Sequence, residues 1–154
     1  MPETSDRLKD RLRADLTTAM KSRDELRTAT LRMVLSAVSA EEVAGSAARE
    51  LSDDEVQAVL RREAKKRREA AEAYDGAGRA EQAARERAEG DVVAGYLPAQ
   101  LDDADLAAIV ADVVTRTGAS GMKDMGRVMG AAQQAVAGRA DGSRVATEVR
   151  RQLA

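Results

Sequence analysis

Most of the side chains that carry acid–base or nucleophilic chemistry in enzymes are missing from this sequence. It contains no His, Cys, Trp, Phe or Asn. Their absence excludes a Ser-His-Asp triad, a cysteine nucleophile, a disulfide and a zinc site of the usual Cys/His kind. Ser120 and Lys123 have the Ser-x-x-Lys spacing of some acyl-transfer enzymes. Nothing else from that arrangement is present, and Ser120 stands where a helix cap is expected, so we interpret it as a cap.

Acidic pairs are the other residues that suggest chemistry, because neighbouring carboxylates can hold a hard cation. The pairs are Asp53-Asp54 and Asp102-Asp103. Each pair precedes an apolar helical pattern, where carboxylates cap free N–H groups and complement the helix dipole. We therefore predict helix starts at both places, and we expect no bound metal or cofactor.

The densest charge feature is the basic run at residues 61–68. On a helix, Arg61, Lys65 and Arg68 share one face, and such a face could neutralise phosphates. Acidic residues lie three or four positions away, which is how a solvated helix pairs its own charges. A solvated face is the favoured interpretation, and phosphate binding is the alternative.

A second candidate nucleic-acid site lies near the C-terminus and consists of Lys123, Arg127, Arg139 and Arg144. From residue 99 onward basic and acidic residues each total seven, so a cationic patch there depends on whether these side chains converge. The whole chain has 25 Lys+Arg and 27 Asp+Glu, and its net charge of −2 gives no overall field for nucleic acid. With Tyr74 and Tyr96 as the only aromatic residues, a base-stacking platform is nearly excluded.

The elements that position these residues are predicted to be helices throughout. The 154 residues are rich in Ala, Leu, Arg and Glu, which lose little entropy in a helix, and only two are Pro. An N-terminal domain at residues 1–98 has about four helices. The first covers residues 6–23 and is capped by Thr4 or Ser5, and the second covers residues 24–43. The third starts at the capping box of Ser52 and Glu55, and the fourth covers residues 79–95.

A C-terminal domain at residues 99–154 is predicted to be a bundle of three short helices. Asp102 caps the first, Gly118 ends it, and the third begins at residues 141–142. The middle helix contains Gly126 and Gly130, four residues apart. Two glycines inside a helix cost stability unless another backbone approaches closely, so we expect a tight helix crossing there.

No segment suits a membrane. The longest unbroken apolar run, residues 106–111, is far too short to span a bilayer, and the N-terminus has no apolar signal region. We expect a soluble, cytoplasmic protein without a membrane partner.

Two stretches of the C-terminal half resemble a known protein family. Residues 122–130 read Met-Lys-Asp-Met-Gly-Arg-Val-Met-Gly, and residues 138–142 read Gly-Arg-Ala-Asp-Gly. Together they closely resemble the signature of the GatB/YqeY family, specifically its stand-alone YqeY-like members. Further matching pieces include residues 20–21, 31–33, 77–79 and 96–98, so the resemblance spans essentially the whole chain. One departure is Ser-Arg-Val-Ala at residues 143–146, where the family usually has Lys-Leu-Val-Asn.

The resemblance implies a helical N-terminal domain joined to a small three-helix domain. The latter is similar to the tail of the B subunit of glutamine-dependent aminoacyl-tRNA amidotransferase, which is the tRNA-contacting appendage of that enzyme. It therefore implies tRNA binding, or association with the amidotransferase or an aminoacyl-tRNA synthetase. The family label is carbon–nitrogen ligase with glutamine as amido-N-donor, but this sequence has no candidate glutaminase nucleophile or phosphorylating centre.

Three functions remain open from the sequence. The leading hypothesis is a non-catalytic accessory protein that contacts tRNA through its C-terminal domain. The alternative is a protein-interaction module that does not bind tRNA, and the third is the carbon–nitrogen ligase activity of the family label.

Overall fold

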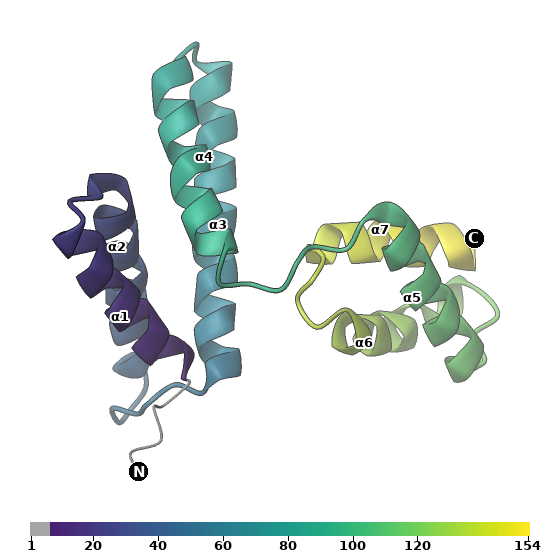
Figure 1. Ribbon diagram of the computed structural model, residues 1–154. Coiled ribbons are helices and arrows are strands. Elements are labelled where there is room, and N and C mark those ends of the chain that lie inside the picture. The colour runs from purple at the N-terminus through teal and green to yellow at the C-terminus, as the bar shows by residue number, and fades with distance from the viewer. Residues whose placement is uncertain (1–6) are drawn as a thin grey trace. The chain divides into compact units, whose positions relative to one another are not determined.

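The computed structural model describes residues 7–154 and contains two compact units, Met1–Leu97 and Pro98–Ala154. Among the described residues all regular elements are helices, seven α-helices and one short 3₁₀ helix (Figure 1). The predicted all-α fold is therefore confirmed. Over the same residues, no helix combines the length and the apolar character that a bilayer span needs.

The N-terminal unit consists of two helical hairpins. The first pairs α1 (Leu8–Lys21) with α2 (Glu25–Glu42), and the second pairs α3 (Asp53–Gly76) with α4 (Ala80–Ala94). Helix α2 contacts α1 and also both helices of the second hairpin (Figure 1).

One helix start in this unit, that of α3, follows the predicted capping chemistry. The Ser52 side chain accepts from the Glu55 N–H, and the Glu55 carboxylate accepts from the Ser52 N–H, which completes the capping box of α3. Asp24 caps α2 by accepting from the Arg27 N–H at 3.0 Å. Thr4 and Ser5, the predicted caps of the first helix, lie outside the described residues. The Leu8 N–H at the start of α1 instead donates to Asp53 Oδ1, a carboxylate from α3, at 3.1 Å.

The aliphatic core of this unit occupies only one end of the α3–α4 hairpin. Helices α1 and α2 cover Val56, Val59 and Leu60 of α3 and Val93 of α4. Further along the hairpin, the fully buried apolar residues are small: Ala71 and Ala83. A core of alanines brings the helices close together but removes less apolar surface from water, so polar contacts are needed there as well.

The C-terminal unit is a bundle of α5 (Asp103–Thr117), α6 (Met125–Val136) and α7 (Gly142–Leu153), with the 3₁₀ helix η1 (Met122–Asp124) before α6. Asp102 caps α5, and Gly118 ends it in the left-handed conformation with φ of 66°, both as predicted. The fully buried side chains are mainly valines: Val110, Val113, Val128, Val145 and Val149.

Two predictions for the middle helix are wrong. Gly126 and Gly130 are exposed, and a Cβ atom on either would meet nothing within 4 Å, so no helix crosses there. Ser120 does not cap α6 or η1 with its side chain. Its own N–H donates to Asp124 Oδ2 at 2.9 Å, so the carboxylate of η1 caps the preceding turn instead.

Candidate nucleic-acid interface

The four predicted basic residues of the C-terminal unit fall into two groups at opposite ends of α5. Arg127 binds the last turn of α5, whereas Arg144 binds the residues at its start. A helix of 15 residues with a rise of about 1.5 Å per residue is roughly 22 Å long. The four side chains therefore do not converge on one point, and a single phosphate group cannot contact all of them.

Arg127 holds the junction between α5 and α6. Its Nη1 donates to the Thr117 carbonyl oxygen at 2.5 Å, and its Nη2 donates to Asp124 Oδ1 at 3.0 Å. The Ser120 N–H and the Arg127 guanidinium together lower the pKa of the Asp124 carboxyl below its usual value. The Thr117 carbonyl is an unsatisfied acceptor at a helix end, and the guanidinium of Arg127 satisfies it.

Arg139 and Arg144 both contact the segment that enters α5. The Leu101 N–H donates to the Arg139 carbonyl oxygen at 2.8 Å. Arg144 Nη2 donates to the Leu101 carbonyl oxygen at 2.9 Å and to Asp103 Oδ1 at 3.0 Å. The side chain of Arg139 donates through Nε to the Val136 carbonyl oxygen at 3.2 Å, which satisfies the C-terminal end of α6.

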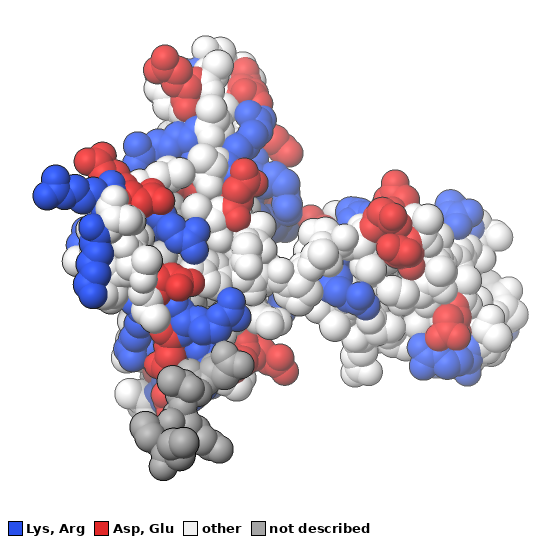
Figure 2. All heavy atoms as spheres, viewed as in Figure 1, with Lys and Arg blue, Asp and Glu red and all other residues white. Residues whose placement is uncertain are grey.

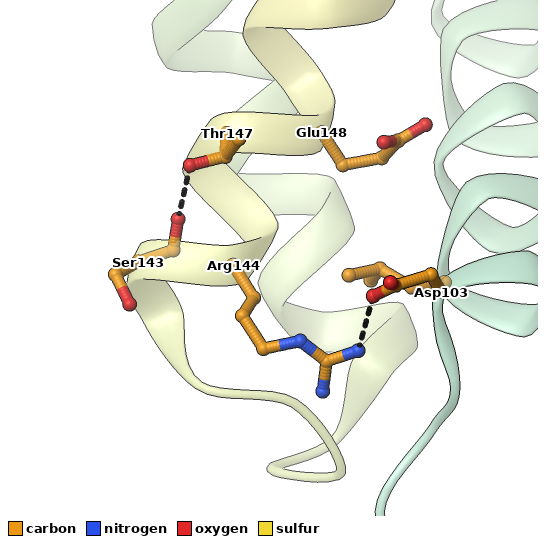
Figure 3. A pocket seen from close by; sticks show the side chains of 6 residues that line it. Asp103, Ser143, Arg144, Thr147 and Glu148 are labelled. Atoms are coloured by element: carbon orange, nitrogen blue, oxygen red, sulfur yellow. Dashed lines mark hydrogen bonds and ion pairs between the residues drawn. The ribbon is translucent and has the colours of Figure 1, made fainter.

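A shallow hollow of about 370 Å³ lies beside Arg144 (Figure 3). Its lining is mixed in charge: Asp103, Leu106, Ser143, Arg144, Thr147 and Glu148. The Arg151 guanidinium and the Gln152 amide lower the pKa of Glu148, so this carboxyl stays ionised near neutral pH. Asp103 pairs with Arg144, and Glu148 pairs with Arg151, so the attraction of the hollow for an isolated anion is reduced.

Lys123 is the least constrained of the four. It lies exposed in η1 and makes no hydrogen bond or ion pair with the rest of the described chain. Its ammonium is therefore available to an external anion without first breaking an internal contact.

The basic run of α3 lies on the N-terminal unit and is largely paired. Lys65 lies 3.9 Å from Glu69, and both side chains are more than half exposed. Arg68 is exposed, whereas Arg61 is half-buried. The Lys65 pair is what the solvated-face interpretation predicts, and such exposed pairs contribute little to stability.

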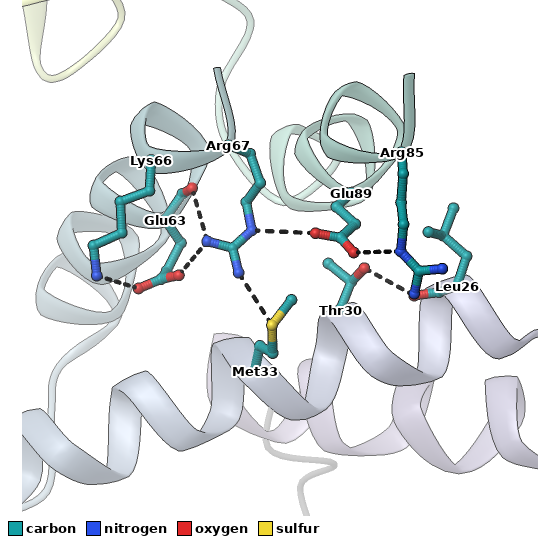
Figure 4. Close-up of polar contacts among 8 residues, drawn as sticks. All are labelled: Leu26, Thr30, Met33, Glu63, Lys66, Arg67, Arg85 and Glu89. Atoms are coloured by element: carbon teal, nitrogen blue, oxygen red, sulfur yellow. Dashed lines mark hydrogen bonds and ion pairs between the residues drawn. The ribbon is translucent and has the colours of Figure 1, made fainter. Parts of the chain in front are cut away.

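Sequence reasoning missed that one member of this run is buried. Arg67 Nη1 contacts Glu63 Oε2 at 2.6 Å, Arg67 Nε lies 3.9 Å from Glu89 Oε2 of α4, and Arg67 Nη2 contacts the Met33 sulfur of α2 at 3.4 Å (Figure 4). All three charged side chains are about a tenth exposed. Arg67 spans α2, α3 and α4, at the point where the aliphatic core ends, so this network is part of the fold.

No part of the described chain gathers three or more acidic side chains in the way a metal site requires. The acidic pair Asp53-Asp54 opens α3, and the pair Asp102-Asp103 opens α5, as predicted.

The fold and the candidate interface define an all-α protein of two helical units, the second of which carries basic side chains at both ends of one helix. A family model described as Yqey-like protein matches residues 9–153. The chain therefore belongs to the Yqey-like protein family, as its resemblance indicated. No match was found among curated proteins.

Proposed function

We propose that this protein is a cytoplasmic, non-catalytic accessory protein related to glutamine-dependent aminoacyl-tRNA amidotransferase, and that its C-terminal unit contacts the tRNA backbone. Family membership supports the relation, because the match extends over the whole of α5, α6 and α7. The observation that carries the proposal is that basic side chains of this unit have hydrogen-bond donors not used in internal contacts. Lys123 is unbonded, and Arg139 and Arg144 use only part of their donors on internal contacts.

The remaining donors suit phosphate. A guanidinium has five N–H groups, and Arg139 uses only Nε on Val136 while Arg144 uses only Nη2 on Leu101 and Asp103. Internal contacts hold each guanidinium in place, so less side-chain entropy is lost when a phosphate binds. The same contacts explain how a unit with balanced charge can bind a polyanion locally.

An extended ligand fits the separation of the two groups. Basic side chains at both ends of α5 are separated by roughly 20 Å, the length of a 15-residue helix. A nucleic-acid backbone presents phosphates along that whole length. Such contacts position a nucleic acid without reading its sequence, so we expect weak selectivity among tRNAs.

The test removes two charges without removing a structural contact between helices. The variant Lys123→Gln with Arg139→Gln is compared with Arg116→Gln with Arg151→Gln, whose arginines are paired with Asp112 and Glu148 on their own helices. Binding of a tRNA transcript is measured by fluorescence anisotropy at several salt concentrations. We expect the first variant to bind more weakly and to lose about one unit of salt dependence per side chain. Equal affinities for the two variants would remove Lys123 and Arg139 from the interface.

A protein-interaction module is the second candidate. It is favoured by α6, where Gly126 and Gly130 leave open space on the surface and where Met122 of the adjoining η1 is 50% exposed. Binding to a protein that persists at high salt, with no binding to tRNA, would support this candidate over the first.

A further inference from the structure

The near-neutral charge of the whole chain conceals a separation of charge within the N-terminal unit. Residues 7–42, which include α1 and α2, contain eight basic and six acidic residues, and two of the acidic residues, Glu41 and Glu42, lie at the C-terminal end of α2. Residues 41–63 contain three basic and seven acidic residues. Because Glu41 and Glu42 lie at one end of the hairpin, the small excess of positive charge belongs to residues 7–40.

Some basic side chains of this hairpin form no ion pair, whereas Lys9 is paired with Glu42 and Arg27 with Asp15. Within the described residues, none of four exposed cations forms an ion pair: Arg13, Lys21, Arg23 and Arg32. We call these four residues the α1–α2 basic surface. Elsewhere most cations are paired, as Arg62 is with Glu41 and Arg127 is with Asp124. An exposed cation outside an ion pair can bind an external anion without first breaking one.

These residues lie along one side of the hairpin. Arg13, Thr17 and Met20 follow each other at helical spacing on α1, and Arg32 Nη2 of α2 lies 3.8 Å from the Met20 sulfur. Lys21 and Arg23 are at the turn that joins the two helices. Basic side chains lie along the edge that α1 and α2 form in Figure 2, with acidic side chains between them.

The acidic residues near the turn are already engaged by α2. Asp24 caps the helix through the Arg27 N–H, and Glu25 lies in the first turn, where the helix dipole favours a carboxylate. At the other end of the hairpin Glu42 pairs with Lys9 at 2.7 Å. These carboxylates keep their charge, and Arg13 helps Lys9 to lower the pKa of Glu42, so the positive charge is least compensated at Lys21, Arg23 and Arg32.

We infer that the α1–α2 basic surface is a second binding surface for the phosphate backbone of RNA, located on the N-terminal unit. The inference rests on the proposed function for the choice of RNA as ligand. Arginine and lysine are typical phosphate-contacting residues. The Thr17 and Thr18 hydroxyls beside them donate to backbone carbonyl oxygens of α1, so the contacts are assigned to the cations alone. An anionic membrane is a poorer match, because Met20 and Met33 are the large apolar side chains exposed on α1 and α2 and insertion needs a continuous apolar face.

The conformation of Arg23 provides a way to separate binding from folding. Its φ of 58° lies in the left-handed region, which glycine adopts without strain and arginine does not. Arg23→Gly should therefore weaken RNA binding while leaving the melting temperature unchanged or raised. A lowered melting temperature, or unchanged binding, would contradict the role given to Arg23.

The main test compares two triple variants of the full chain with the same change in charge. The first is Arg13→Gln, Lys21→Gln and Arg32→Gln. The matched control is Arg62→Gln, Lys65→Gln and Lys66→Gln, whose cations are all paired with carboxylates. Binding of a tRNA transcript is measured against salt concentration. We expect the first variant to lose about two to three units of the salt-dependence slope and the control to lose less than about one. Equal slopes would overturn the inference.

The outcomes separate this inference from the proposed function. If the variant Lys123→Gln with Arg139→Gln binds weakly and the α1–α2 triple variant binds normally, only this inference fails. If the α1–α2 triple variant binds weakly and the variant Lys123→Gln with Arg139→Gln binds normally, the N-terminal surface is supported and the C-terminal contact is contradicted. Wild-type protein that binds no tRNA, or that sediments with phosphatidylserine vesicles but does not bind tRNA, overturns both.

Discussion

The guanidinium of Arg67 lies between two carboxylates that are nearly removed from water. Glu63 is on the same helix, whereas Glu89 comes from α4. Arg67 Nε is buried and makes no hydrogen bond, so the network gains less than its ionic contacts suggest. Removing one member of such a network strongly lowers the free energy of unfolding, because the charge that remains is buried away from water and has lost its partner.

We predict a large difference between two neighbouring substitutions. Arg67→Met leaves Glu63 and Glu89 without their shared cation and should lower the free energy of unfolding by about 3–5 kcal/mol. Lys66→Met removes an ammonium that contacts the same Glu63 at 3.3 Å but is 69% exposed, and it should cost less than about 1 kcal/mol. Urea unfolding at neutral pH measures the free energy of unfolding of both variants. Similar decreases for the two would show that burial does not decide how much each cation contributes to stability.

Tyr96 connects the end of the N-terminal unit to α1 and α2. Its hydroxyl donates to Asp15 Oδ2 and accepts from Arg27 Nη2 at 3.1 Å. The Arg11 and Arg27 guanidiniums lie 5.8 and 6.0 Å from the ring centroid, within cation–π range. Burial and the bond to Asp15 raise the pKa of Tyr96 to about 12.

This raised pKa predicts a loss of stability in alkali. Because folding favours the protonated phenol, its contribution is complete below the ordinary pKa of about 10 and is lost as pH rises toward 12. Tyr96→Phe should be less stable at neutral pH and should lose less of its unfolding free energy between pH 10 and 12. Unfolding free energies of both proteins across that range test this, and parallel decreases would contradict it.

At the scale of elements, sequence patterns predicted where helices begin and end better than what they contact. The capping box at Ser52 and the left-handed glycine at Gly118 are local signals, and the structure confirms both. Burial of Arg67 depends on α4, more than 20 residues away, and the alternating charges of α3 concealed it. The glycines of α6 were wrongly assigned to a helix crossing, because spacing alone cannot show whether a neighbour is present.

The open surface of α6 leads to a prediction for the whole helix. Gly126→Ala with Gly130→Ala should stabilise the protein by about 1–2 kcal/mol, since alanine favours helix and the added methyl groups meet nothing within 4 Å. Thermal unfolding measures the change. Binding of tRNA should be unaffected, whereas loss of binding to a protein partner would show that this glycine surface is an interface. Destabilisation would contradict the open space around both residues.

For the whole molecule, composition predicted the all-α fold, and short motifs predicted the family. Net charge was a poor guide to partners, because it averaged the basic residues 7–40 with the acidic residues 41–63. Counting charge by segment would have revealed this difference. The division of Lys123, Arg127, Arg139 and Arg144 into two groups could not be predicted, because it depends on how α6 and α7 pack at the two ends of α5.

The central claim is that this Yqey-like protein contacts the tRNA backbone, and binding of wild-type protein to a tRNA transcript at rising salt tests it most directly. Phosphate contacts release counterions, so the logarithm of the binding constant should fall linearly with the logarithm of salt concentration, by about 0.7–0.9 units per contact. We predict a slope that corresponds to several contacts. No binding at low salt, or binding that does not change with salt, would contradict the account.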